Sequence, residues 1–227
     1  DNNTYIDSKQ THLVLPLIAG VVPKNDISKV ESKLKEEILV SQNGHFDTGI
    51  HGTYFLVKYL TENYHHDLLY TLASQTTYPS YGEIIERGEI TWPEYWSECN
   101  SRVHGCLNGI GGWFQRGVLG IQLDPKKVGY KEFIVKPAFH DSLQWVKGHH
   151  VSSYGKINVS WVKTDEDYLL ELTVPHNTSS TVFIPARAVS DILENNKPIK
   201  SFGEIKLLGF ENNIAELRLG SGAYQFK

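Results

Sequence analysis

The stretch GIQLDPKKVGY, residues 120–130, separates two halves of this 227-residue sequence that have different hydrophobic periods. Before it, apolar residues recur every three or four positions, which is typical of helices. After it, apolar and polar residues alternate, which is typical of strands. A run of helices followed by a run of strands predicts a helical domain joined to an antiparallel β-sandwich. We expect these domains at residues 1–121 and 122–227.

The helical period is clearest in DISKVESKLKEEILVSQNG, residues 26–44. Ser28 and Glu31 have the spacing of a capping box, and Asn43 and Gly44 predict the end of the helix. One apolar stripe is expected to contain Val30, Leu34, Ile38 and Leu39.

Four further segments are expected to be helical. In the last of them, the glycines at positions 105, 109 and 112 each lower helix stability by about 1 kcal/mol relative to alanine. We expect close contact with a neighbouring helix to offset this loss. The four segments are QTHLVLPLIAG (10–20) with a kink at Pro16, GTYFLVKYLTENY (52–64), HDLLYTLASQT (66–76) closed by Pro79, and SRVHGCLNGIGGWFQRGVLG (101–120).

The second half contains strand segments separated by turn sequences. Alternation predicts one buried face for each strand. The turn sequences HNTSS, ENNKP and LGSG are rich in residues that favour tight turns. The strand segments are KINVSWV (156–162), YLLELTV (168–174), STVFIPA (180–186) and GAYQFK (222–227).

Composition narrows the classes of partner. The formal net charge is -4, with intermingled signs and no basic block, so neither nucleic acid nor a membrane surface is an expected partner. Cys99 and Cys106 are too few for a disulfide framework and have no partner pair for structural zinc. There is no membrane-spanning apolar run and no methionine, even at position one, so we expect a processed chain or a fragment.

Two loops between the helices, residues 43–54 and 77–99, are rich in glycine, aromatic residues and acids. Loops at one end of a helical scaffold can line a pocket together. An indole or phenol ring stacks on the apolar face of a sugar, while carboxylates and amides bond its hydroxyls. The loops therefore favour a carbohydrate ligand.

Six ordered motifs resemble the C-terminal half of bacterial α-L-rhamnosidases of glycoside hydrolase family 78. The resemblance covers nearly the whole chain and implies the later helices of an (α/α)6 barrel followed by a C-terminal β-sandwich. The motifs are QTHLVLPLIAGVVP (10–23), GHFDTGIHGTYFL (44–56), YPSYGEIIERGEITWPEYW (78–96), SRVHGCLNGIGGWFQRGVLGI (101–121), GYKEFIVKP (129–137) and SSYGKINVSWV (152–162).

The resemblance implies an inverting hydrolase that releases terminal L-rhamnose. A protonated acid assists the leaving group, and a carboxylate about 6.5–9.5 Å away activates water on the opposite face. The family motif that carries the general base matches PEYW (93–96), which implies Glu94 as the base and Trp96 as a stacking residue. The first tryptophan of that motif is replaced by Pro93, and Trp92 stands one position earlier.

The resemblance also implies that His104 bonds the sugar, whereas the asparagine usual before it is Val103 here. The family's general acid lies in the first half of the barrel, which this sequence does not contain. We therefore expect an L-rhamnose-containing carbohydrate and the missing N-terminal part of the barrel as partners, no cofactor or metal, and no activity from this chain alone. Secretion or a periplasmic location is implied by the family only.

Several residues have alternative interpretations. Glu98 could serve as the base if the loop register slips, while Glu83, Glu86 and Glu89 are expected to be exposed or structural. Asp47 could bond a sugar hydroxyl, but Asp-Thr-Gly also suits a turn or helix cap, which we favour slightly. We expect buried packing roles for Trp113, Trp145 and Trp161, and small buried apolar roles for the two cysteines.

Two other functions remain open from the sequence. One is a non-catalytic carbohydrate-binding module, in which the helical loops or the sandwich hold glycan without hydrolysis. The other is a pure scaffold. Binding of L-rhamnose without hydrolysis by a longer version of the protein would favour the module.

Overall fold

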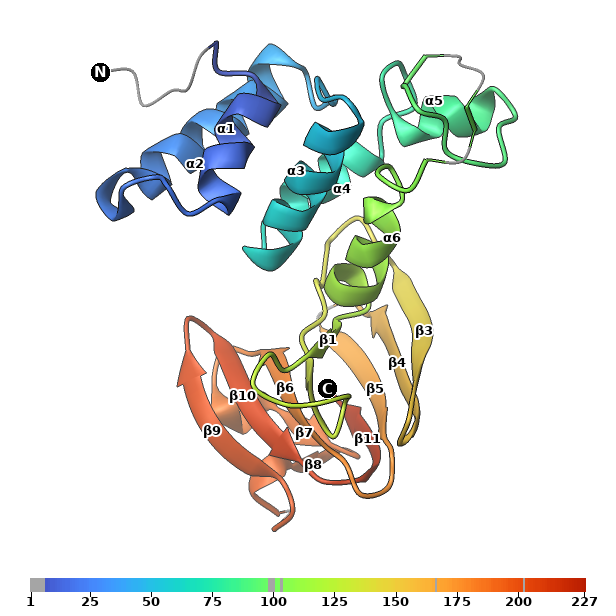
Figure 1. Cartoon of the computed structure of the whole chain (residues 1–227). Helices are drawn as coiled ribbons and strands as arrows, with labels where there is room; N and C mark the ends of the chain where they lie inside the picture. Colours follow the sequence, from blue (N-terminus) through green and yellow to red (C-terminus); the bar gives the residue numbers. More distant parts are fainter. Residues whose placement is uncertain (1–6, 98–100, 103, 166, 202) are drawn as a thin grey trace. The chain divides into compact units, whose positions relative to one another are not determined.

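The computed structural model describes residues 7–97, 101–102, 104–165, 167–201 and 203–227. The chain forms two compact units, Asp1–Trp113 and Phe114–Lys227. The first unit is helical and the second contains the β-strands, as labelled in Figure 1. The expected order of a helical part followed by a β part is confirmed, while the division into domains at residues 121 and 122 stays a prediction.

The helical unit has short helices joined by structured loops. Three short helical turns with a wider or tighter hydrogen-bond pattern extend these helices, namely η1 (Lys24–Asp26), η2 (Glu37–Ser41) and η3 (Phe114–Val118). Of these, η3 belongs to the second unit. The helices are α1 (Gln10–Ile18), α2 (Ile27–Glu36), α3 (Ile50–Glu62), α4 (His66–Ala73), α5 (Tyr81–Glu86) and α6 (Gly109–Trp113). In the part of the chain that the structure describes, no helix has the length and apolarity needed to cross a membrane.

Helices α1 and α3 pack closely because a glycine lies at their contact. A Cβ atom at Gly52 of α3 would collide with the Thr11 side chain of α1, so a larger residue there would push the helices apart. The helical period of each segment supplies the core of this unit. Its fully buried members include Leu13, Val14, Leu34, Ile38, Leu56 and Leu60.

Contrary to expectation, Leu39 is 38% exposed and does not share the buried stripe of Val30, Leu34 and Ile38. Three further details of the helical prediction were wrong. Ser28 does not cap a helix: α2 begins at Ile27, and the Ser28 carbonyl accepts a hydrogen bond from Ser32 Oγ within the helix. The long helix expected over residues 101–120 is helical only from Gly109, because residues 105–108 form turns. Helix α5 was not predicted, although Ser80 Oγ accepts a hydrogen bond from Glu83 N and caps its first turn.

The second unit consists of two sheets. The five-stranded sheet has the order β1-β2-β6-β10-β9, and the six-stranded sheet has the order β3-β4-β5-β11-β7-β8. The strands are β1 (Ile121–Leu123), β2 (Glu132–Val135), β3 (Trp145–Ser152), β4 (Gly155–Lys163), β5 (Tyr168–Val174), β6 (Ser179–Pro185), β7 (Leu193–Glu194), β8 (Lys197–Pro198), β9 (Lys206–Glu211), β10 (Ile214–Leu219) and β11 (Gly222–Phe226).

Among the described residues, strand pairing is antiparallel except between β2 and β6. The three intervening strands β3, β4 and β5 all belong to the other sheet, so the chain returns to the first sheet beside β2 in the same direction. The expected sandwich is therefore confirmed, with one parallel pair that the sequence did not predict.

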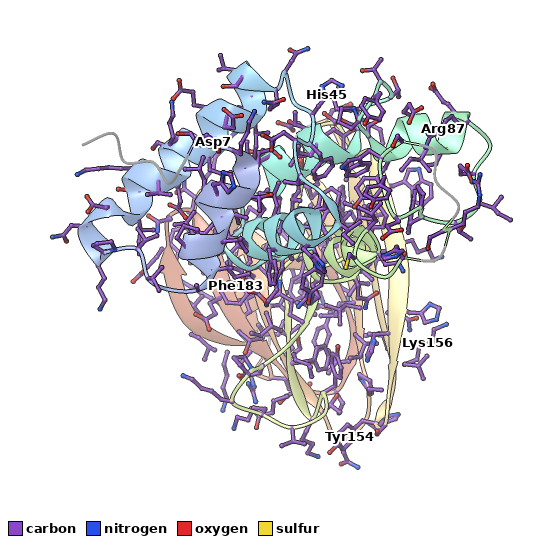
Figure 2. All side chains as sticks on the ribbon, turned by 45° about the horizontal axis from the view of Figure 1, so that its top comes forward. Asp7, His45, Arg87, Tyr154, Lys156 and Phe183 are labelled. Atoms are coloured by element: carbon purple, nitrogen blue, oxygen red, sulfur yellow. The ribbon has the colours of Figure 1, made fainter. Side chains whose placement is uncertain are left out.

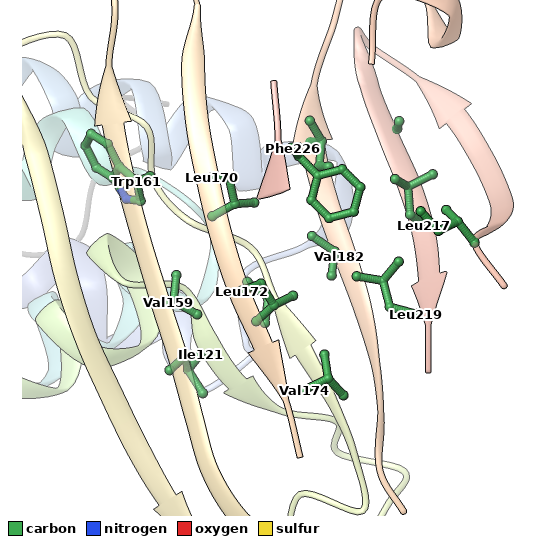
Figure 3. Packing of buried hydrophobic residues seen from close by; sticks show 14 of the residues in the cluster. Ile121, Val159, Trp161, Leu170, Leu172, Val174, Val182, Leu217, Leu219 and Phe226 are labelled. Carbon is green, nitrogen blue, oxygen red and sulfur yellow. The ribbon is translucent and has the colours of Figure 1, made fainter. Parts of the chain in front are cut away.

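The sandwich core lies between the inward faces of the two sheets (Figure 3). The predicted inward faces of β4 and β5 are confirmed. Ile157, Val159 and Trp161 are at most 1% exposed, and Leu170, Leu172 and Val174 at most 2%. The indole N–H of Trp161 donates to the Val118 carbonyl at 3.2 Å, so its one polar group is satisfied inside the core.

Candidate active-site loop

The loop that follows α5 is closed by two backbone hydrogen bonds. Glu94 N donates to the Ser101 carbonyl at 3.1 Å, and His104 N donates to the Trp92 carbonyl at 3.2 Å. These bonds join the two limbs of the loop in antiparallel fashion. They place the Glu94 and His104 side chains together, with 3.7 Å between Glu94 Oε1 and His104 Nε2.

Both side chains of this pair remain accessible. The Glu94 side chain is 34% exposed and the His104 side chain is 29% exposed. A carboxylate held beside an imidazole and open to solvent can accept a proton from a water molecule. The geometry therefore provides what a general base needs first, which is access to water.

An aromatic cluster of Phe46, Tyr81, Trp92 and Trp96 supports the loop. Tyr81 meets Trp92 and Trp96 edge to face, with ring centroids 5.1 and 5.2 Å apart. Phe46 stacks on Trp96 at 5.0 Å. Edge-to-face and stacked pairs add to the stability gained from burial alone, so the cluster ties the loop to α5 and to the segment before α3.

Trp96 is anchored by two hydrogen bonds, one to a residue 48 positions away and one to a residue nine positions away. Its indole N–H donates to the Thr48 carbonyl at 2.7 Å, and its own carbonyl accepts from Arg87 Nη2 at 3.0 Å. Arg87, labelled in Figure 2, also lies 3.4 Å from the Glu83 carboxylate. Trp96 is 8% exposed, so little of its ring is available to a ligand.

Tyr81 is the centre of the cluster. It is 4% exposed, and its hydroxyl donates to the Leu107 carbonyl at 2.9 Å. Burial raises the pKa of the phenol well above its usual value, so the hydroxyl stays protonated and remains a donor. This bond links α5 to the turn that precedes α6. An ion pair between Glu89 and Arg102 joins the two limbs of the loop further out.

Asp47 is held by the start of α1. Its Oδ1 accepts a hydrogen bond from Gln10 N at 3.2 Å, and its Oδ2 lies 3.7 Å from Lys9 Nζ. Burial raises the pKa of the Asp47 carboxyl above its usual value, and the nearby Glu37 acts in the same direction. The backbone hydrogen bond from Gln10 opposes this shift. Asp47 therefore joins two segments of the fold, and its contact with sugar stays a prediction.

No group of three or more metal-ligating side chains occurs among the residues that the structure describes. Cys106 is a free thiol, half-buried rather than fully buried, and its sulfur lies 3.9 Å from His51 Nδ1. Glu98, Cys99 and Val103 lie outside the described residues, so the alternative base at Glu98 has no structural account.

The structure thus brings four of the predicted site residues into one loop, namely Trp92, Glu94, Trp96 and His104. Sequence reasoning missed the supporting residues Phe46, Tyr81 and Arg87. Ser80 and Glu83 have the spacing of a capping box, a signal that could have indicated α5 and the position of Tyr81. Glu83 and Arg87 also have the i,i+4 spacing of an ion pair on a helix, whereas the contact of Arg87 with Trp96 and the contacts of Phe46 have no local sequence signal.

Comparison with known proteins assigns the chain to a family of glycosidases with six helical hairpins. Residues 1–118 match the bacterial alpha-L-rhamnosidase 6 hairpin glycosidase domain, and residues 120–197 match the bacterial alpha-L-rhamnosidase C-terminal domain. Because the first match alone covers more than half of the sequence, the chain belongs to the bacterial alpha-L-rhamnosidase family. The family and fold expected from the six motifs are thereby confirmed.

Individual relatives agree with this assignment. An alpha-L-rhamnosidase of Formosa agariphila is 30% identical over 95% of this chain and 23% of its own length. One of Alteromonas sp. is 31% identical over 87% of this chain and 22% of its own length. The chain therefore spans less than a quarter of the length of these two relatives.

Solved structures show the same relationship. The alpha-L-rhamnosidase from Dictyoglumus thermophilum has a TM-score of 0.83 at 28% identity, over 96% of this chain and 25% of that protein. The Streptomyces avermitilis alpha-L-rhamnosidase complexed with L-rhamnose has a TM-score of 0.84 at 26% identity, over 96% of this chain and 21% of that protein.

Proposed function

We propose that this chain contributes the general base to an inverting α-L-rhamnosidase, whose active site is completed by further sequence of a longer protein. The observation that carries the proposal is the Glu94–His104 pair, 3.7 Å apart and accessible, on a loop fixed by the aromatic cluster. Membership of the rhamnosidase family supports terminal L-rhamnose as the sugar that is released.

In the proposed reaction, Glu94 takes a proton from water as the water oxygen bonds to the anomeric carbon. The bond from that carbon to the glycosidic oxygen breaks on the opposite face. A protonated carboxylic acid, about 6.5–9.5 Å from the base in inverting enzymes, gives its proton to the leaving oxygen. In this proposal the acid belongs to a part of the enzyme outside residues 1–227.

His104 and the tryptophans have separate proposed roles. His104 orients the Glu94 carboxylate and bonds a sugar hydroxyl, because its ring lies beside that carboxylate and is 29% exposed. Trp92 is half-buried and can offer a ring face to the sugar. Trp96 is almost fully buried, with its N–H already bonded to Thr48, so it supports the loop from beneath.

The test is Glu94→Gln in the longer enzyme, which keeps the shape of the side chain and removes its basicity. We expect kcat to fall by about 10²–10⁴-fold, the usual contribution of a general base, with KM little changed. Glu86→Gln is the matched control, because Glu86 is an exposed glutamate of α5. Equal turnover in the two variants would contradict the role of Glu94.

Analysis of the product tests the stereochemistry separately. Rhamnose released by the longer enzyme should first appear as the β-anomer and then equilibrate, as NMR recorded within minutes can show. Initial release of the α-anomer would contradict an inverting mechanism.

A further inference from the structure

The outer face of the six-stranded sheet presents polar side chains in rows. Alternate residues of each strand point away from the core, and the strand register brings these residues side by side. One row contains Lys147, Ser160, Glu171 and Gln225. The next row contains His149, Asn158, Thr173 and Ala223.

A pocket of about 630 Å³ lies over these two rows. This volume is within the range of small-ligand sites. Its lining includes Lys147, His149, Lys156, Asn158, Glu171 and Gln225, and therefore contains both donors and acceptors of hydrogen bonds. Lys156 is the second residue of β4, directly after the β3–β4 turn, and is labelled in Figure 2.

The single acid among these outward-facing residues already has partners. Glu171 Oε2 accepts a hydrogen bond from Ser160 Oγ at 3.0 Å, and Glu171 Oε1 accepts one from Gln225 Nε2 at 3.3 Å. Neither Lys147 nor Lys156 forms an ion pair or a side-chain hydrogen bond with another residue that the structure describes. The pocket therefore has two unpaired cations against one acid whose oxygens are both bonded.

An exposed apolar row borders the polar rows. This row crosses β3, β4 and β5 and consists of Trp145, Val162 and Leu169. Each of them lies two residues along its strand from a member of the first polar row, which contains Lys147, Ser160 and Glu171. Trp145 is 67% exposed and Val162 is 46% exposed. The buried packing role expected for Trp145 was wrong, because this residue has the same orientation as Lys147 and His149. The exposed indole lies next to the row that contains Lys147 and the Ser160 hydroxyl, and an indole face suits the apolar face of a sugar ring.

We propose that this face of the sandwich binds an oligosaccharide containing uronic acid, with sugar carboxylates paired to Lys147 and Lys156 and a sugar ring stacked on Trp145. The positive balance of the pocket selects a carboxylate-bearing glycan over a neutral one. Asn158 and Gln225 bond the ring hydroxyls. This face belongs to the second unit, whereas the loop that carries Glu94 belongs to the first, and binding to the sheet requires no catalysis.

Calorimetric titration of the full chain with an oligogalacturonate tests the proposal, with a neutral malto-oligosaccharide of equal length as the comparison. We expect binding of the acidic sugar only, and a weaker interaction at high salt. Lys147→Gln combined with Lys156→Gln should weaken binding at least tenfold. Lys206→Gln, at an exposed lysine on β9 of the other sheet, should leave it unchanged.

Trp145→Ala separates sugar recognition from simple attraction between charges. The affinity of this variant for the oligogalacturonate should be at least threefold lower than that of the wild type. Its affinity for inorganic sulfate should be no higher than that of the wild type. Circular dichroism of each variant establishes that the fold is retained, as expected for exposed positions. No binding of the acidic sugar, equal binding of the neutral sugar, or unchanged binding by the double lysine variant would each overturn the proposal.

Discussion

The loop around Glu94 and the outer face of the six-stranded sheet position their side chains in different ways. In the sheet, a continuous ladder of strand pairs fixes each row, above a core that contains Trp161. In the loop, two backbone hydrogen bonds join the limbs, and single side-chain bonds from Trp96, Arg87 and Tyr81 hold the rest. The loop should therefore be sensitive to changes in individual supporting residues, whereas the sheet should be sensitive to changes in its core.

The largest effect is expected in the core beneath the sheet. Trp161→Ala should destabilise the second unit by about 3–5 kcal/mol, because it removes a fully buried indole and leaves a cavity. Urea unfolding of the full chain, followed by circular dichroism in the β region, measures the loss. A loss below about 1 kcal/mol, well under the usual cost of such a cavity, would show that the sheet does not depend on this core.

A smaller but more local effect is expected at the loop anchor. Trp96→Phe retains an aromatic ring and removes the donor to the Thr48 carbonyl, which leaves a buried acceptor unpaired at a cost of about 1–3 kcal/mol. The longer enzyme should lose turnover as the loop shifts, and urea unfolding should report the lost stability. For the unfolding measurement Trp92→Phe is the control, because no hydrogen bond from the Trp92 indole is found among the described residues. Equal losses of stability in the two variants would contradict the anchoring role.

Amide hydrogen exchange compares the two regions directly. The amides of Glu94 and His104 should exchange at least tenfold faster than those of Val159 and Leu172, a difference of about 1.4 kcal/mol in opening free energy. The reason is that each loop bond stands nearly alone, whereas β4 and β5 are paired along most of their length. Equal protection would show that the loop is as cooperative as the sheet.

The smallest effect is a pH dependence at Asp47. Because burial raises its pKa in the folded state, the folded protein holds this proton more tightly than the unfolded chain. The contribution of Asp47 to stability is therefore greatest below its usual pKa of about 3.9 and declines as the pH rises through the raised value. Asp47→Asn retains an acceptor for Gln10 N and should remove this decline.

Urea midpoints of the wild type and of Asp47→Asn, measured from acidic to neutral pH, test that sign. As the pH rises through the titration of Asp47, the urea midpoint of the variant should increase relative to that of the wild type. A change in the opposite direction would mean that the Gln10 hydrogen bond and Lys9 outweigh burial.

Much of the fold could be predicted from periodicity. The two-residue period placed Ile157, Val159 and Trp161 on the inner face, and all three are buried. The same period applied to β3 would have placed Trp145 outward, beside Lys147. The helical half was less predictable, because the glycine-rich segment after residue 101 satisfies a helical pattern while residues 105–108 form turns.

The candidate site depended on the family resemblance. Periodicity carries no information on which loop residues meet, and the pairing of Glu94 with His104 depends on loop closure. The Trp96–Thr48 bond joins residues 48 positions apart, so no local pattern can predict it. The composition of the loop indicated a sugar site, and the three-dimensional fold supplied its supporting residues.

Chemical rescue of Glu94→Ala in the longer enzyme tests the central claim most directly. With an aryl α-L-rhamnoside as substrate, the variant should be nearly inactive, and sodium azide should restore release of the aryl group by acting where the activated water attacked. The account predicts a rhamnosyl azide of inverted, β configuration. Undiminished turnover of the variant without azide, or an azide product of retained configuration, would contradict the assignment of Glu94 as the base.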